Sequence, residues 1–280
     1  MKNDTDLLSI LKTIVLSGGL VLKAFRGRVE NIPKESDLPP EKVQKSSVAH
    51  TAVDDLVQEV ALEILSSHLP DVAINVEEDT PRSKLFSQDK TDLCFHLDPL
   101  DGTLAYLQGS DGFTIGAAFS QNLEFEVSAI YFPARDQLFL GERGKGAKMQ
   151  ANLGKERTIG RSEHASNTYV QKRCDSFLPI IKKMRLKPFN SMSAHNTMIA
   201  IARGEVRLQM YHMASPHDFG IPQVVVEELG GICTDLEGNS IKYGPKFDRI
   251  PYFLTFYDPE TKDEFFEELN REKSETKQLH

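Results

Sequence analysis

Cysteine is scarce in this chain and tryptophan is missing. The 280 residues include three cysteines, Cys94, Cys174 and Cys233, which lie far apart without a CxxC pair or a neighbouring histidine cluster. A disulfide framework or a structural zinc site needs paired or closely spaced cysteines, so this spacing argues against both. We therefore expect reduced thiols and a cytoplasmic protein.

Basic residues are fewer than acidic ones. The sequence has 33 Lys and Arg residues against 41 Asp and Glu residues, a formal net charge of −8 at pH 7. Anionic surfaces repel such a chain, which argues against a general binder of nucleic acids or membrane surfaces. The net charge does not exclude binding of small anionic ligands, because bound cations can make the local electrostatic potential positive.

The N-terminus lacks a long uncharged apolar run. Asp4 and Asp6 stand where a signal peptide would be basic. Lys12 and Lys23 interrupt the apolar stretch, which argues against a membrane span. A core-facing amphipathic helix is predicted instead, because apolar or small residues recur at helical spacing, at Leu7, Leu11, Ile14, Gly18 and Leu22.

The rest of the chain divides into two patterns. A polar segment with three prolines (28–47) predicts a surface loop, and a helix is predicted over 51–69 with one apolar side at Val53, Leu56, Val57, Val60 and Ile64. Short strands are predicted at 72–76 and 93–97, followed by an antiparallel meander over 112–120, 124–132 and 136–143. From about residue 160, helices and strands alternate, with helices at 176–186, 221–231 and 258–273 and strands at 206–213 and 252–257. We therefore expect an α+β domain over 1–158 and an α/β domain over 159–280.

Acidic residues follow three of these elements. Glu77, Glu78 and Asp79 come after one strand, Asp98 and Asp101 after the next, and Asp218 stands near the start of a helix. Carboxylates are the ligands that Mg²⁺ prefers, usually with waters and substrate phosphate, and no cluster of soft ligands competes. Together these acids predict a magnesium site.

The stretch "DPLDGT" (98–103) adds the means to bind a phosphate. Its proline fixes one φ and Gly102 permits a tight turn, so that both aspartates can face one point. The backbone carbonyl of Leu100 offers a further ligand. Gly102 and Thr103 would begin a helix whose N–H groups face a phosphate oxygen, and the Thr103 hydroxyl could orient a water.

Taken singly, each acidic residue has a simpler explanation. Glu77, Glu78 and Asp79 could form a solvated loop, Asp218 a helix cap, and Asp54 part of an exposed helix surface. A covalent aspartyl-phosphatase is a rival for "DPLDGT", since the haloacid-dehalogenase motif D-x-D-G-T is similar. There the two aspartates are two positions apart and share one side of an extended strand, whereas Asp98 and Asp101 are three apart. The covalent mechanism is therefore the weaker hypothesis.

These motifs resemble the inositol monophosphatase superfamily, which includes 3'(2'),5'-bisphosphate nucleotidases and some fructose bisphosphatases. "VEED" (76–79), "DPLDGT" (98–103), "PHD" (216–218) and the run "GGICTDLEGNSIKY" (230–243) follow the order of its motifs, and "TAVD" (51–54) resembles its Thr-x-x-Asp. The resemblance implies a layered α-β-α-β-α sandwich and a lithium-sensitive, Mg²⁺-dependent phosphatase that attacks with water. The cations would lower the pKa of a water, neutralise the phosphate and stabilise the leaving oxygen.

The resemblance also assigns residue roles. The implied ligands of two or three Mg²⁺ ions are Glu77, Asp98, the Leu100 carbonyl, Asp101 and Asp218. Asp54, Glu77 and Thr103 would act in catalysis, with Asp54 and Thr103 working on the attacking water. Gly102, Thr103 and Asp218 would contact the substrate, a small phosphate ester. A homodimer is a family expectation only.

Several positions depart from the superfamily pattern. His217 replaces the usual Trp before the third acidic motif, and Leu104, Ala105 and Tyr106 match neither the monophosphatases nor the nucleotidases. The double Glu of "VEED", Pro222 after Asp218, and Tyr211 in place of a sugar-binding Glu favour the nucleotidase branch. An inositol or sugar phosphatase and a catalytically silent homologue, suggested by His217 and Ala105, stay as alternatives.

Overall fold

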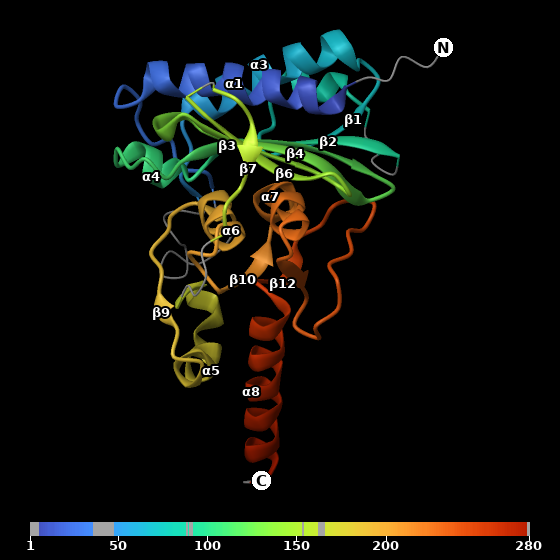
Figure 1. The fold of residues 1–280 in the computed structure, drawn as a ribbon. Coiled ribbons are helices and arrows are strands. Elements are labelled where there is room, and N and C mark those ends of the chain that lie inside the picture. The colour runs from blue at the N-terminus through green and yellow to red at the C-terminus, as the bar shows by residue number, and fades with distance from the viewer. Residues whose placement is uncertain are drawn as a thin grey trace.

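The computed structural model describes residues 6–35, 48–87, 89, 92–152, 154–161 and 166–278. Two helices, α1 (Leu7–Phe25) and α3 (Ala52–His68), lie along the outer face of a first sheet, as Figure 1 shows. Of the loop predicted over 28–47, residues 36–47 lie outside the described residues.

The first sheet has seven strands in the same order as the sequence. The first two strands are parallel and all the other neighbours are antiparallel. In spatial order they are β1 (Ala73–Val76), β2 (Leu93–Asp101), β3 (Thr114–Gln121), β4 (Glu124–Phe132), β5 (Gln137–Glu142), β6 (Gly146–Ala151) and β7 (Arg157–Thr158). The predicted meander is confirmed as β3, β4 and β5. The strands β6 and β7 were not predicted, because β6 alternates weakly and β7 has two exposed residues.

The second sheet is mixed and has five strands. Their spatial order is β11 (Ile232–Thr234), β12 (Ile250–Phe256), β10 (Leu208–Ala214), β8 (Asn167–Val170) and β9 (Lys187–Pro188). Two helices, α6 (Ala194–Ala202) and α7 (Pro216–Glu228), separate the two sheets, and α5 (Leu178–Lys183) and α8 (Pro259–Gln278) cover the far face (Figure 1). Short helical turns complete the chain, namely η2 (Arg82–Leu85), α4 (Thr103–Leu107), η3 (Pro133–Arg135) and η4 (Lys172–Phe177).

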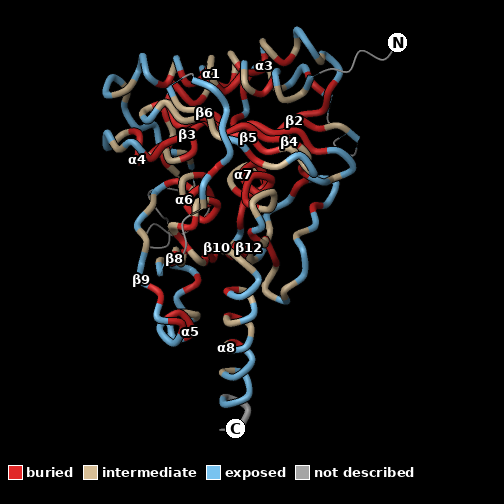
Figure 2. The backbone as a smooth tube through the Cα atoms, in the orientation of Figure 1, coloured by how far each residue is buried: buried red, intermediate tan, exposed pale blue. Residues whose placement is uncertain are grey.

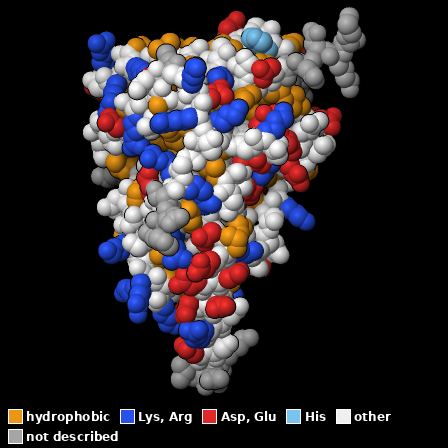
Figure 3. Space-filling view, viewed as in Figure 1, with side chains coloured by type: hydrophobic (Ala, Val, Ile, Leu, Met, Phe, Trp, Pro, Cys, Tyr) orange, Lys and Arg blue, Asp and Glu red, His pale blue; other side chains and the backbone are white. Residues whose placement is uncertain are grey.

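Three hydrophobic clusters fill the spaces between these five layers (Figure 2). The first joins α1 and α3 to the first sheet, the second surrounds α6 and α7, and the third joins the second sheet to α5 and α8. The acidic C-terminal segment forms α8, which extends beyond the layers and carries many Asp and Glu side chains on the face seen in Figure 3. Phe265 on the same helix is buried, so α8 packs through one side and is solvated on the other.

The predicted first helix is confirmed, and four of its five predicted core positions are buried. Leu7 is half-buried and packs against the cluster. By length and composition α1 could cross a membrane. In the described structure its apolar face packs on α3 and the first sheet, through Ile10, Leu11, Ile14, Val15, Gly18, Gly19 and Leu22.

The second helix buries part of the predicted side: Val53 and Val57 are buried, and Val60 and Ile64 are half-buried. Leu56 is 40% exposed, whereas Asp54 and Gln58 are almost completely buried. The apolar pattern missed part of the buried face because two polar side chains belong to the core, where hydrogen bonds satisfy them. The buried Asp54 also corrects the expectation that this residue, taken singly, lies on an exposed helix surface.

Two element boundaries near the acidic motifs also differ from the prediction. The strand β2 continues through Asp101, with an irregular register between Asp98 and Asp101, so both aspartates belong to the strand. The helix α7 begins at Pro216, five residues earlier than predicted, with Ser215 as its N-cap residue. Asp218 therefore lies inside the first turn and is not the cap.

Two leucines of α1, one buried and one exposed, allow a test of how this helix packs against the core. Leu11→Ala removes a fully buried side chain, whereas Leu20→Ala removes one that is 67% exposed on the same helix. We expect Leu11→Ala to lower the free energy of unfolding by about 2–5 kcal/mol, because it leaves a cavity, and Leu20→Ala to change it by less than about 0.5 kcal/mol. Urea denaturation measures both, and equal losses would contradict this packing.

Candidate metal and phosphate site

The turn after β2 brings its two aspartates together. Asp98 and Asp101 are buried, and the Oδ1 of Asp98 accepts the Leu100 N–H at 3.1 Å. Gly102 has a left-handed backbone, with φ of +83°, and a Cβ there would lie 2.9 Å from the Cβ of Ser193. Any other residue would be strained and would push against the segment before α6. The glycine thus lets the chain turn directly into α4 beneath that segment.

Asp101 is held by the start of α6. Its carboxylate accepts the Ser193 hydroxyl, the N–H groups of Ala194 and His195, each at 2.9 Å, and the Thr114 hydroxyl at 3.3 Å. Ser193 is also the N-cap residue of α6. These hydrogen bonds fix the orientation of the carboxylate.

His195 connects this turn to the helix that carries Asp218. Its ring is completely buried, with Nδ1 2.9 Å from the Thr114 hydroxyl and Nε2 3.0 Å from the His217 carbonyl. The carbonyl can only accept, so Nε2 carries a proton, and the single proton of the Thr114 hydroxyl can be directed either to Nδ1 or to Asp101. A Cβ at Gly116 would lie 2.3 Å from the ring, so the small residue makes the close approach feasible. His195 therefore belongs to the core.

Asp54 and Thr103 meet on the other side of the turn. Asp54 closes a capping box at the start of α3, where its Oδ2 accepts the Thr51 N–H at 2.9 Å and the Thr51 hydroxyl at 2.6 Å. The Thr103 hydroxyl lies 3.1 Å from the Oδ1 of Asp54 and 3.0 Å from the Leu100 carbonyl oxygen. The Thr103 hydroxyl therefore lies between the buried carboxylate of Asp54 and the Leu100 carbonyl, a candidate metal ligand.

The three acids after β1 take three different positions. Glu77 is half-buried and lines the same cavity as Asp98, Glu78 is buried, and Asp79 is exposed. The ammonium group of Lys34 lies 2.7 Å from the carboxylates of both Glu77 and Glu78. Gln58 holds the backbone of Glu78 through its side-chain amide.

The carboxylates repel one another strongly. Ligand atoms of Asp98, Asp101 and Asp218 all lie within 4.8 Å of each other. Burial, together with the charges of Glu77 and Asp101, raises the pKa of Asp218 to about 8. Burial and the charges of Glu77, Asp101 and Asp218 raise the pKa of Asp98 well above its usual range. A cation among these groups would remove the repulsion.

Glu77 has the opposite electrostatic balance. Burial by itself would raise its pKa, but His217 and Lys34 lower it below the usual range. Because burial lowers the pKa of His217 to about 4, Lys34 is the partner that carries the positive charge at neutral pH. Burial and the charge of Glu77 raise the pKa of Asp54, which makes Asp54 a better proton acceptor than a solvated aspartate.

The donor set fits a hard divalent cation. Carboxylate oxygens and the Leu100 carbonyl line the cavity, without a cysteine among its lining residues. Such oxygen ligands suit Mg²⁺. The described residues contain a second group of possible metal ligands, formed by His50, Asp55 and Glu78. The ammonium group of Lys34 already forms an ion pair with Glu78 in that group.

The cavity beside these ligands has a volume of about 220 Å³. The predicted residues Glu77, Asp98, Leu100, Asp101, Gly102, Thr103 and Asp218 all line it, together with Leu104, Tyr211 and His217. Asp54 does not line the cavity and reaches it through Thr103. Tyr106 is buried and donates to the Leu22 carbonyl, so it supports the fold and does not face the cavity. The functional roles of these residues stay predictions.

Sequence reasoning missed several residues that orient the site. They are Lys34, Gln58, Thr114 and Ser193, and Gln209, which it also missed, lines the cavity without a hydrogen-bond partner among the described residues. Lys34 lies in an irregular segment, and the other four are polar residues within or beside apolar patterns. The serine three residues before Asn196 could have been found as a helix cap, but its contact with Asp101 spans 92 positions and has no local signal.

Three clustered carboxylates beside a cavity are suited to a metal-dependent site. The Inositol monophosphatase family model matches residues 5–256, and the chain belongs to this family of phosphomonoester hydrolases. A fructose-1,6-bisphosphatase/inositol-1-monophosphatase of Thermotoga maritima is 25% identical over 79% of this chain and 81% of its own length. A protein of the same description from Aquifex aeolicus is 27% identical, covering 84% and 87%.

The comparison of structures supports the predicted fold class. The T. maritima inositol monophosphatase superposes with a TM-score of 0.72 and 23% identity, covering 94% of this chain and 97% of its own. The layered α-β-α-β-α sandwich predicted from the sequence is therefore confirmed.

The repulsion among the carboxylates predicts two linked effects of Asp98→Asn. The variant should be more stable than the wild type in the presence of a chelator, because it removes a buried, repelled charge. It should also lose the rise in melting temperature that Mg²⁺ gives the wild type, since a ligand that binds only the folded state stabilises it.

Asp79→Asn is the matched control, because this acid lies in the neighbouring motif with its side chain 81% exposed. It should keep the Mg²⁺-dependent rise. Thermal unfolding with chelator and with Mg²⁺ measures both effects. An undiminished Mg²⁺ response in Asp98→Asn would contradict the assignment of Asp98 as a ligand.

Proposed function

We propose that this phosphatase uses two or three Mg²⁺ ions and acts on 3'(2'),5'-bisphosphate nucleosides. The family supports the reaction class, and the convergence of Asp98, Asp101 and Asp218 on one cavity supports the metal dependence. Mg²⁺, when bound, would supply an acidified water and neutralise the phosphate charge. Glu77, Asp98, Asp101, Asp218 and the Leu100 carbonyl are the residues that would hold it.

The chain's own groups would move the proton of the attacking water. The Thr103 oxygen can accept a hydrogen bond from that water while its own proton points to Asp54, 3.1 Å away. The raised pKa of Asp54 suits a residue that receives a proton during the reaction. Gly102 and Thr103 line the cavity where the phosphate would lie.

The observation that carries the nucleotide preference is a second cavity that adjoins the first. It has a volume of about 810 Å³, within the range of sites for drug-sized ligands. The two cavities share Tyr169, Ser191 and Met192. A leaving group the size of a nucleoside could extend into this space, whereas 220 Å³ alone suits a smaller molecule.

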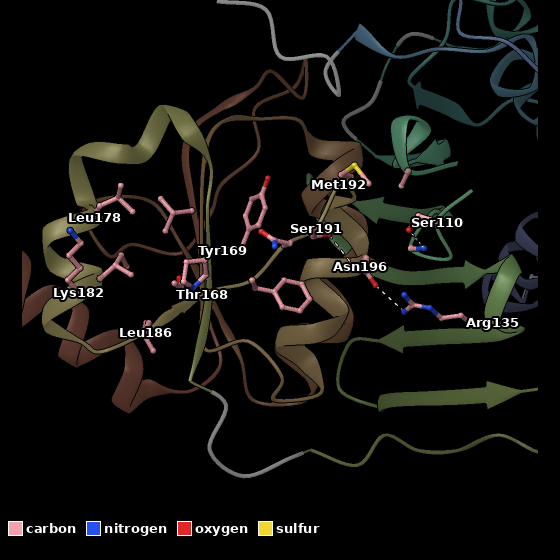
Figure 4. Close-up of a pocket in the computed structure, with 17 residues that line it drawn as sticks. Ser110, Arg135, Thr168, Tyr169, Leu178, Lys182, Leu186, Ser191, Met192 and Asn196 are labelled. Carbon is pink, nitrogen blue, oxygen red and sulfur yellow. Dashed lines mark hydrogen bonds between the residues drawn. The ribbon is translucent and has the colours of Figure 1, made fainter. Parts of the chain in front are cut away.

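The ends of the second cavity carry positive charge. Figure 4 shows Lys182 near one end, on α5, and Arg135 near the other, beside the first sheet, with Tyr169 and Met192 between them. Arg135 donates to Asn196, and both cations are largely exposed. A second phosphate group is the type of ligand that such cations recognise. This arrangement supports a bisphosphate.

Inositol monophosphate is the second candidate and a sugar bisphosphate the third, since both activities appear in the names of the relatives. Ala105 lines the larger cavity and His217 the smaller one. A catalytically silent protein that binds Mg²⁺ and phosphate stays an alternative to be tested. The cytoplasmic location, the domain division, the homodimer, and the absence of nucleic-acid and membrane partners stay predictions.

A side-by-side assay distinguishes these substrates. Purified protein with Mg²⁺ should release phosphate from adenosine 3',5'-bisphosphate with a higher kcat/KM than from myo-inositol 1-phosphate or fructose 1,6-bisphosphate. Activity should be lost with a chelator and inhibited by Li⁺. A higher kcat/KM for either other ester would contradict the nucleotide preference, and no release from any of the three would contradict the proposed phosphatase activity.

Two variants of Thr103 test whether the protein is catalytically active or only binds Mg²⁺ and phosphate. Thr103→Ser keeps the hydroxyl and should keep most of the activity, whereas Thr103→Val removes the hydroxyl and should lower kcat by at least about 10²-fold. Mg²⁺ binding by calorimetry should be similar in both. Binding of Mg²⁺ and phosphate without turnover in the wild type would favour the silent protein.

A further inference from the structure

Gln209 lies on the central strand of the second sheet, beneath the phosphate site. It pairs with Tyr169 on β8 and with Thr255 on β12. Side chains alternate along a strand, so Gln209 and Tyr211 share the face toward α6 and α7, while Leu208 and Met210 belong to the cluster on the other face. Gln209 therefore faces the cavity that Asp101 and Asp218 also line.

The amide of Gln209 is fully buried and has no partner. The residue is 0% exposed, and neither the oxygen nor the nitrogen of its side chain has a hydrogen bond to any described residue. Burying such a group without a partner costs about 1–3 kcal/mol. Buried amides are normally paired, and an unpaired one that lines a cavity can bond a ligand there.

Two tyrosines extend this polar surface. Tyr169 and Tyr211 line the same cavity, and neither hydroxyl has a hydrogen bond to a described residue. The ring of Tyr211 packs against Phe219, with 4.6 Å between the ring centroids, which fixes its position. Burial raises the pKa of both tyrosines, followed by the charge of Asp101 for Tyr169 and of Asp218 for Tyr211, so both hydroxyls stay neutral.

The cavity thus has two chemically different sides. Carboxylates suited to a cation line one part of it, and an uncharged amide and two tyrosines line another. The exposed side chain of Arg249 also lines the cavity and donates to the Met213 carbonyl at 3.0 Å. Uncharged donors and acceptors match alcohol groups, each of which both donates and accepts. A substrate held by its phosphate at the acidic side would present its neighbouring alcohol carbons to Gln209.

We propose that Gln209 determines specificity by hydrogen-bonding a hydroxyl next to the phosphorylated carbon of the substrate. The inference rests on the proposed phosphatase function and names the substrate class as monophosphate esters of vicinal diols. The 2'-hydroxyl of adenosine 3',5'-bisphosphate and the ring hydroxyls of myo-inositol 1-phosphate both satisfy this requirement. Gln209 would contribute to selection between alcohols and would not take part in proton transfer.

Matched pairs of esters test the proposal with Gln209→Met, which keeps the size of the side chain but cannot bond a hydroxyl. One pair is adenosine 3',5'-bisphosphate and its 2'-deoxy analogue, and the other is myo-inositol 1-phosphate and cyclohexyl phosphate. We expect the ratio of kcat/KM within each hydrolysed pair to fall by about 10- to 100-fold in the variant. The kcat/KM for 4-nitrophenyl phosphate, which has no hydroxyl, should fall by less than the kcat/KM for the hydroxyl-bearing ester of each pair.

Stability separates this role from a structural one. Gln209→Met should raise the melting temperature, because it replaces an unpaired buried amide with an apolar group. Thr255→Val is the control: this residue is buried beside Gln209, bonds the Met198 sulfur and does not line the cavity. It should leave the substrate ratios unchanged. If Gln209→Met does not fold, Gln209→Asn withdraws the amide by one methylene and should lower the same ratios.

The outcomes distinguish a failure of the proposed role of Gln209 from a failure of the proposed phosphatase function. Unchanged ratios in the Gln209 variants, or an equal loss on all esters including 4-nitrophenyl phosphate, would overturn the role of Gln209 and leave the phosphatase function intact. A lower melting temperature for Gln209→Met together with unchanged ratios would assign Gln209 to the fold alone. A wild type that hydrolyses none of the esters with Mg²⁺ would contradict the proposed function itself.

Discussion

Mutual repulsion among buried carboxylates is the constraint around which this protein is arranged. Asp98, Asp101 and Asp218 come from the first sheet and the middle helical layer, and their oxygens lie within 4.8 Å of each other. Such a cluster is unfavourable unless donors or cations compensate it. Asp101 accepts hydrogen bonds from Ser193, Ala194 and His195. Asp98 and Asp218 have strongly raised pKa values and fit a cation between them.

The surrounding structure holds these acids in place against that repulsion. His195 connects the Asp101 turn to the first turn of α7 through two hydrogen bonds, and Gly102 lets the strand turn beneath Ser193. Gln209 adds a further cost, because its buried amide has no partner among the described residues. Unpaired polar groups of this kind lower the stability of the protein but are free to bind a ligand, and such a trade-off between stability and activity is common in enzymes.

Much of the fold and the identities of the candidate ligands could be predicted from the sequence, because both depend on local patterns. The period of the apolar residues gave α1, and the order of strands and turns gave the meander. The buried face of α3 was predicted only in part, at Val53 and Val57, because Asp54 and Gln58 are buried polar residues that a hydrophobic pattern treats as exposed. Ser193, Lys34 and Gln209 act through partners far along the chain, and only the folded structure brings those contacts together.

The central claim is that a divalent cation binds among Asp98, Asp101 and Asp218. Anomalous diffraction from crystals grown with Mn²⁺, a substitute for Mg²⁺ with a strong anomalous signal, tests it most directly. The strongest peak should lie within about 2.5 Å of oxygens from these three carboxylates. No peak there, or peaks confined to the group of His50, Asp55 and Glu78, would contradict the claim.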